Sequence, residues 1–150
     1  MMRTSSPKRV RTEATGAADR LHSAAIRLLR FARVADIRSG IGPARLSALS
    51  VLVYAGPLSL KRLAQIEQVR QPTMSRIAVG LERLGLVRRT PSPKDRRAIL
   101  LRPTALGLRT LEAARRRRIA ILAEKMESFS GAELVVLAAA AGLVLERLQR

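Results

Sequence analysis

Short polar side chains and one arginine lie close together in residues 71–76, directly after an expected turn. The members with useful hydrogen-bonding groups are Gln71, Thr73, Ser75 and Arg76, with Pro72 between the first two. Glutamine can form two hydrogen bonds with adenine, and arginine can form two with guanine. A surface that binds nucleic acid through charge alone would not need the three uncharged side chains. The cluster is therefore typical of a surface that reads bases as well as phosphates.

A basic loop follows this cluster at a distance suited to a second contact with the nucleic acid. Residues 90–97 hold two prolines and three cations, and they end in Lys94, Asp95, Arg96 and Arg97. The flanking segments 86–89 and 98–102 have the composition of strands, so they predict a β-hairpin with a protruding basic tip. Arg83, near the end of the expected helix, is better placed for a phosphate than for a base. Ser59, the expected cap of the preceding helix, is a further candidate contact.

Apolar periodicity and helix caps predict the helices that carry these side chains. The spacing predicts helices over 17–37, 43–54, 60–67, 72–84, 104–128 and 134–149. The stripe expected to face inward on the fourth helix consists of Met74, Ile77, Leu81 and Leu84. Residues 1–16 are basic and polar, and we expect them to form a disordered tail. The order helix, helix, turn, helix, hairpin predicts a winged helix-turn-helix, a mainly α fold with a small β-hairpin.

The charge balance points to a polyanionic partner. The chain has 150 residues, with 29 Lys and Arg against 11 Asp and Glu, and a net charge of +18. Nucleic acid is the first candidate, and an anionic membrane surface is the second. The longest apolar run is too short for a membrane span, and the N-terminus lacks the apolar segment of a secretory signal. We therefore expect a cytoplasmic protein that binds double-stranded DNA and no membrane.

The rare residue types exclude several kinds of site. The chain has no cysteine, which excludes disulfides, thiolate metal sites and thiol redox sensing. Its one histidine, His22, cannot make an imidazole metal cluster. The three aromatic residues are too few for a base-stacking platform. With no phosphate-binding glycine motif and no histidine beside paired carboxylates, we expect neither an enzyme nor a cofactor.

The last predicted helix indicates a second copy of the chain. Residues 134–145 are an unbroken apolar run when Ala and Gly are counted. A helix that is apolar on nearly all sides must be covered on most of them, and a chain this small has little material left to do so. We therefore expect a homodimer. Residues 17–38 and 104–150 would form its dimerisation region, and residues 43–103 its DNA-binding domain.

Residues 56–107 together resemble the MarR family of bacterial regulators. Gly56–Ala64 is similar to that family's entry into the helix-turn-helix. Pro72–Ile77 and Leu81–Arg89 match its recognition helix and first wing strand. Asp95-Arg96-Arg97, followed by Leu101, Thr104 and Gly107, matches its wing signature and the start of the next helix. The flanking helices agree with the family in order and length.

The resemblance implies an obligate dimer, a role for Arg97 in the minor groove and a role for Asp95 in shaping the wing tip through hydrogen bonds. It also implies a small-ligand pocket between the dimerisation and DNA-binding parts, often for phenolic or other aromatic acids. His22, Phe31 and Tyr54 are the candidates for lining it. The alternative places Phe31 and Tyr54 in the core and His22 in solvent or in a structural role. The missing cysteine excludes the family's thiol-based sensing.

The leading hypothesis is a sequence-specific transcriptional regulator, expected to be a repressor, that binds a pseudo-palindromic operator as a homodimer and is released by a small ligand. The alternative is a nonspecific architectural nucleic-acid-binding protein, which the charge of +18 would suit. Alternative interpretations of individual segments stay open. Residues 71–76 could be a solvated helix start, and Arg96 and Arg97 could be solubilising charges. Arg115–Arg118 could contact DNA, but solvated faces and intersubunit pairs with Glu112 or Glu124 are the favoured interpretation.

Overall fold

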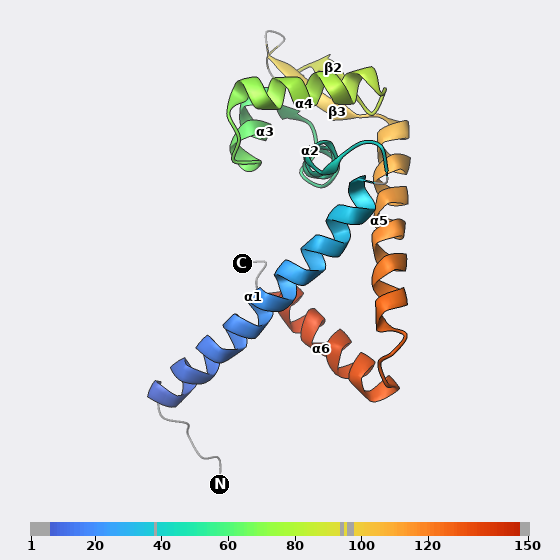
Figure 1. The fold of residues 1–150 in the computed structure, drawn as a ribbon. Helices are drawn as coiled ribbons and strands as arrows, with labels where there is room; N and C mark the ends of the chain where they lie inside the picture. The colour runs from blue at the N-terminus through green and yellow to red at the C-terminus, as the bar shows by residue number, and fades with distance from the viewer. Residues whose placement is uncertain (1–6, 38, 94, 96–97, 148–150) are drawn as a thin grey trace.

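The computed structural model describes residues 7–37, 39–93, 95 and 98–147 of the chain. Three helices and a small sheet form one end of the molecule, here called the head, and three further helices make up the rest (Figure 1). The elements of the head are α2 (Pro43–Tyr54), β1 (Leu58–Ser59), α3 (Leu60–Ile66), α4 (Gln71–Arg83), β2 (Val87–Pro91) and β3 (Ile99–Pro103). The others are α1 (Pro7–Ile37), α5 (Ala105–Met126) and α6 (Gly131–Arg147). This is the predicted mainly α winged helix-turn-helix.

The head is built around its own apolar core. Five of its leucine and methionine side chains have no exposed surface, namely Leu49, Leu52, Leu63, Met74 and Leu81. They come from α2, α3 and α4, so each of these helices contributes to one shared core. Close packing of this kind fixes the helices relative to one another.

A three-stranded antiparallel sheet completes the head, with the strand order β1-β3-β2. Leu101 of β3 lies opposite Leu58 on one side and Arg89 on the other. The predicted hairpin of β2 and β3 is confirmed. Periodicity does not predict β1, because two residues are too few to show an alternation.

Local capping chemistry sets the helix ends where the sequence predicts them. Ser59 caps α3 through a 3.2 Å hydrogen bond from a backbone N–H, and Thr104 caps α5 through one of 3.0 Å. At the start of α6, the Ser130 N–H donates to Glu133 Oε2 at 2.8 Å, and the Glu133 N–H donates back to Ser130 Oγ at 3.3 Å. Gly85 ends α4 with a φ of 68°, the left-handed conformation that favours glycine.

The N-terminal helix is longer than expected. α1 begins at Pro7 rather than at Ala17, so residues 7–16 of the expected disordered tail are helical. Proline suits the first turn of a helix, and the Lys, Arg, Glu and Ala residues that follow it are good helix formers. Residues 1–6 lie outside the described part of the chain.

The inward stripe of α4 also differs from the expectation at one position. Met74 and Leu81 are fully buried as predicted, and Ile77 is half-buried. Leu84 is 45% exposed, because α4 ends at Arg83 and the chain then turns away. Ala78 is the further buried residue of this face.

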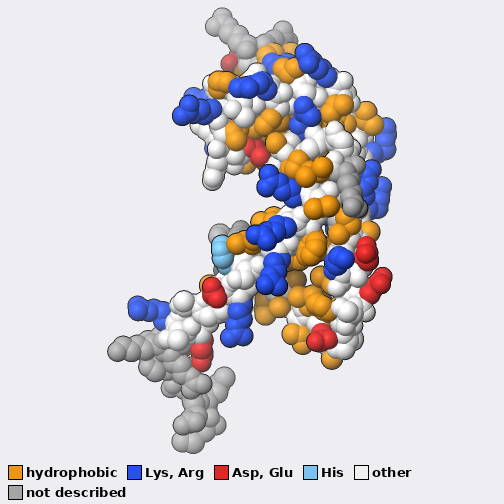
Figure 2. All heavy atoms as spheres, in the orientation of Figure 1, with side chains coloured by type: hydrophobic (Ala, Val, Ile, Leu, Met, Phe, Trp, Pro, Cys, Tyr) orange, Lys and Arg blue, Asp and Glu red, His pale blue; other side chains and the backbone are white. Residues whose placement is uncertain are grey.

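The three remaining helices leave much apolar surface uncovered. α1 and α5 meet beside the head and diverge away from it, and α6 lies at the opposite end from α4 (Figure 1). No described residue of α6 is buried, and Val135 and Leu145 are 69% and 63% exposed. Leu29 of α1 is 68% exposed. Figure 2 shows hydrophobic side chains gathered at the surface over much of this part of the molecule, although charged side chains are prominent at its lower-left end.

Candidate nucleic-acid interface

α4 has one face in the core and the opposite face in solvent. Met74, Ala78 and Leu81 are buried. The exposed side chains include Pro72, Thr73, Arg76 and Arg83. Gln71 is exposed at the first position of the helix, and Ser75 is half-buried. The structure therefore brings the predicted base-reading residues together on one helix, with Ser75 the least accessible of them.

The start of α4 offers free backbone donors. Arg70 is the N-cap residue, and its side chain makes no capping hydrogen bond. Pro72 has no N–H, so the amides of Gln71 and Thr73 are the donors that remain in this first turn. Amides at a helix N-terminus favour an anion such as a phosphate. This end of α4 therefore suits a nucleic-acid backbone as well as base edges.

Ser59 has a structural role besides the predicted contact. Its Oγ accepts the hydrogen bond from the Arg62 N–H that caps α3, so its hydroxyl proton and one lone pair are left for a partner outside the chain. Next to it, α3 exposes Lys61 and Arg62, which the sequence interpretation did not single out. The surplus of basic residues between 61 and 102 was the signal that could have identified them.

An ion pair fastens the hairpin to α4. Arg89 Nε on β2 lies 2.9 Å from Glu82 Oε1 on α4. Arg88, its neighbour in the strand, is exposed. Towards the tip, the Ala98 N–H donates to the Asp95 carbonyl oxygen at 2.9 Å, and the Asp95 residue is exposed. The other predicted tip contacts, Lys94, Arg96 and Arg97, lie outside the described residues.

Basic side chains dominate the surface of the head. Figure 2 shows Lys and Arg side chains spread over this end of the molecule. Two of its acidic side chains are engaged inside the head, since Glu67 accepts a 3.0 Å hydrogen bond from Ser47 and Glu82 pairs with Arg89. The exposed charge of the described part of the head is therefore mainly positive, which suits binding to phosphates.

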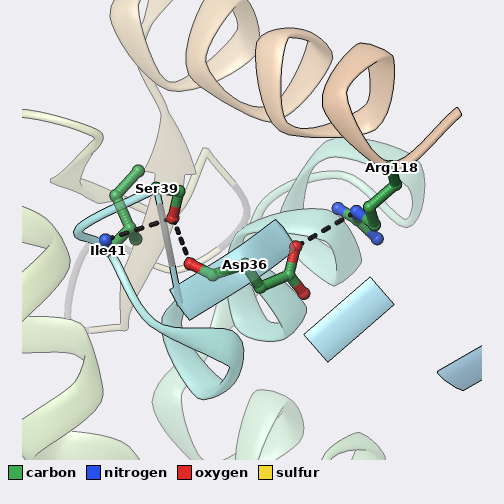
Figure 3. A network of polar contacts seen from close by, with 4 residues as sticks. All are labelled: Asp36, Ser39, Ile41 and Arg118. Atoms are coloured by element: carbon green, nitrogen blue, oxygen red, sulfur yellow. Dashed lines mark hydrogen bonds and ion pairs between the residues drawn. The ribbon is translucent and has the colours of Figure 1, made fainter. Parts of the chain in front are cut away.

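A cleft of about 410 Å³ lies where α1, α2 and α5 meet. Asp36 of α1 and Arg118 of α5 are part of its lining, and Asp36 Oδ1 lies 3.2 Å from Arg118 Nε (Figure 3). The Ser39 hydroxyl donates to the Asp36 carbonyl oxygen, and the Ile41 N–H donates to Ser39 Oγ at 3.2 Å. The network joins the end of α1, the segment leading to α2, and α5. Arg33 of α1 also lines the cleft.

The three residues predicted to line a ligand pocket are not in this cleft. His22 and Phe31 are exposed on α1, and Tyr54 is 74% exposed at the end of α2. Tyr54 does not belong to the core either, because α2 ends at this residue and its side chain faces solvent. The sequence interpretation missed Asp36 and its pairing with Arg118, since no local pattern relates two residues so far apart in the chain.

The arginine run on α5 divides between two roles. Arg115 and Arg116 are solvated and lie 3.6 Å and 3.7 Å from Glu112 of the same helix, so these pairs form within one chain rather than between subunits. Arg118 instead turns inward to Asp36. Within the described ranges, no group of three or more His, Asp or Glu residues could hold a metal ion. No helix in those ranges is long and apolar enough to cross a membrane.

Comparisons with known proteins agree with this geometry. A family model described as the MarR family matches residues 39–98. An HTH-type transcriptional regulator of Mycobacterium tuberculosis is 36% identical over 125 residues, which cover 83% of this chain and 87% of that protein. A MarR family protein of Bacillus stearothermophilus superposes with a TM-score of 0.73 at 24% identity, covering 97% of this chain and 100% of the other. A mutant of S. aureus MepR bound to an oligodeoxyribonucleotide gives a TM-score of 0.66 at 20% identity, covering 89% and 98%.

Proposed function

Because this chain belongs to the MarR family of helix-turn-helix transcriptional regulators, which bind DNA and are not enzymes, we propose that it represses transcription as a homodimer on a pseudo-palindromic DNA site. The observation that carries the proposal is the exposed face of α4. Thr73, Arg76 and Arg83 lie there, opposite residues that are locked in the core of the head. A polar helix face on a rigid support suits the major groove.

In this proposal the predicted contacts divide between bases and backbone. Gln71, Thr73, Ser75 and Arg76 read base edges at the N-terminal half of α4, which begins at Gln71-Pro72. The backbone contacts are Ser59 and Arg83. Lys94, Asp95, Arg96 and Arg97 form the wing, with Arg97 in the adjacent minor groove. The S. aureus MepR structure, which contains an oligodeoxyribonucleotide, supports DNA as the partner.

The uncovered helices support the homodimer. α6 has no buried residue although most of its side chains are apolar, and Leu29 and Ile37 of α1 are more than 60% exposed. Burying such surface against a second copy is favourable by about 25 cal/mol for each Å² removed from water. Two-fold symmetry would then place the two α4 helices on half-sites about 10–10.5 base pairs apart.

Release by a small aromatic or phenolic effector completes the proposal. The cleft between α1, α2 and α5 lies where the head meets the other helices, so an occupant could change their relative placement. Arg33 and Arg118 in its lining could pair with an acidic group on such an effector. His22, Phe31 and Tyr54 do not line this cleft, so they remain candidates only for effector contacts elsewhere on the molecule.

Selection of bound sequences from random DNA duplexes tests the proposal. We expect an enriched inverted repeat. When the protein is present in the cytoplasm, we expect lower transcription of a reporter gene that carries this repeat at its promoter. If no sequence is enriched and random duplexes bind as tightly as any other, the nonspecific architectural function holds instead. Reporter transcription that rises with the regulator present would overturn the repressor assignment.

A further inference from the structure

Arg45 of α2 lies directly over the backbone of α4 at Gly80. A Cβ atom added at Gly80 would lie 2.5 Å from Arg45 Nε, 3.0 Å from Nη2 and 3.1 Å from Cζ. These distances show that the guanidinium group occupies the space that a side chain at position 80 would take. Glycine is among the poorest residues for a helix interior, so a residue other than glycine would favour α4 itself. A side chain at position 80 would therefore displace the flexible end of Arg45 from its present place.

The charge of Arg45 is not neutralised inside the head. Its Nη1 donates to the Ile41 carbonyl oxygen at 3.2 Å, and no acidic side chain lies within 4 Å of it in the ranges that the structure describes. A half-buried arginine with one backbone partner keeps several N–H donors for a partner outside the chain. An anion is the partner that would satisfy both the charge and these donors.

The position of Arg45 relates it to the exposed face of α4. Arg45, Thr73 and Arg76 line one shallow groove of about 340 Å³ between the start of α2 and α4. Thr73, Arg76 and Gly80 follow one another at spacings of three and four, so they lie along one side of the helix. When α4 enters a major groove, the DNA strand that borders the groove on this side would pass the start of α2.

We propose that Arg45 contacts a backbone phosphate of bound DNA beside the recognition helix, and that Gly80 leaves free the space that Arg45 needs to do so. This role rests on the docking of α4 in the major groove proposed above. Arg45 reads no base, so its contribution is the same for every sequence, and it increases the salt dependence of binding. The contact made by Arg45 holds the DNA backbone beside the side of α4 that faces α2.

The experiment compares the full-length protein with Arg45→Gln, Gly80→Ala and the double variant by fluorescence anisotropy, on one selected duplex and one random duplex, over a series of salt concentrations. Arg20→Gln, at an exposed arginine of α1 and so outside the head, is the matched control for loss of one charge. Thermal unfolding of each variant reports on the fold.

We expect Arg45→Gln to weaken binding to both duplexes about tenfold or more, as loss of a charge-assisted hydrogen bond does. The slope of log affinity against log salt should become shallower by about 0.9 for each lost phosphate contact. Gly80→Ala should produce the same loss with an unchanged or higher Tm, because Arg45 must move away while the helix gains alanine. The double variant should bind no worse than Arg45→Gln.

Several results would overturn this role for Arg45. One is an Arg45→Gln variant that binds and responds to salt as Arg20→Gln does, while the wild type still selects its preferred duplex. Another is a loss of affinity with an unchanged salt slope and a lowered Tm, which would make Arg45 a purely structural residue. If instead the wild type has no preferred duplex but Arg45→Gln flattens the salt slope, sequence-specific regulation fails and the phosphate contact stands.

Discussion

Asp36 on α1 and Arg118 on α5 form an ion pair, 3.2 Å from Oδ1 to Nε, at the place where the head joins the long helices. The Asp36 side chain is 12% exposed and that of Arg118 is 31% exposed. Neither of these two atoms makes a hydrogen bond of good geometry within the described ranges, so the attraction between them is mainly charge on charge. The same aspartate accepts the Ser39 hydroxyl through its backbone, so one residue links α1, α5 and the segment leading to α2.

Removal of the cation from this pair should destabilise the protein. In Arg118→Met the Asp36 carboxylate stays buried without a cation, and we expect the free energy of unfolding to fall by about 1–3 kcal/mol. Chemical denaturation at one fixed protein concentration measures the change. Arg117→Met removes an exposed neighbour and should stay within about 0.5 kcal/mol of wild type. Equal stability of the two variants would show that the ion pair contributes nothing.

Arg76 and Arg83 should have different effects on sequence preference. They lie seven residues apart, so they share one face of α4 at opposite ends. Arg76→Ala should cost about 1–3 kcal/mol on the best site and relax the preference at one position of each half-site. Arg83→Ala should weaken all sequences about equally and lower the salt slope by about one unit. Selected-sequence profiles of both variants check this, and the reverse pattern would mean that α4 docks the other way round.

The effect of the flanking DNA sequence should reveal whether Arg97, which lies outside the described residues, contacts the minor groove. A·T-rich tracts have a narrow and more negative minor groove, which attracts an inserted arginine. We therefore expect Arg97→Ala to lose more affinity on operators with A·T-rich flanks than on operators with G·C-rich flanks. Titrations on the two matched duplexes provide the comparison. Equal losses would leave Arg97 as an ordinary backbone contact.

A charge in α6 should separate the proposed dimer. Leu137 is 38% exposed in the single chain, and in a dimer a glutamate there would be buried without a partner. We expect Leu137→Glu to sediment as a monomer or to unfold, with lower affinity for the operator. Ile66→Glu, at a 40% exposed position in the head, should sediment as the wild type does. A folded Leu137→Glu monomer with normal DNA binding would contradict the dimer.

The capping box of α6 should be visible in a titration. The Ser130 backbone N–H, and then the Ser130 hydroxyl, donate to Glu133 and hold the pKa of its carboxyl below the ordinary value. Because the pKa is depressed in the folded state, the cap stabilises α6 above the ordinary glutamate pKa and loses this effect as the pH falls through the folded pKa. Ser130→Ala should raise the pKa part of the way back, as followed by carboxyl NMR, whereas Ser128→Ala should leave it unchanged.

The capped starts of α3, α5 and α6 were predictable because they depend on neighbouring residues. A serine or threonine oxygen can reach only the amides of the next turn, so Ser59, Thr104 and Ser130 could be recognised as caps from their position. Periodicity likewise located the buried Met74 and Leu81 on α4. It also predicted that Arg76 lies on the opposite side of the helix.

The order of the elements, the basic head and the polar face of its recognition helix could be inferred from the amino-acid sequence alone, because each depends on residue types within a few turns. Only the tertiary structure placed Arg45 over Gly80, Asp36 beside Arg118, and β1 against β3. It also left Tyr54 in solvent and formed the cleft from three separate helices. Contacts of this kind join residues far apart in the chain. They depend on how whole helices pack, which no local spacing records.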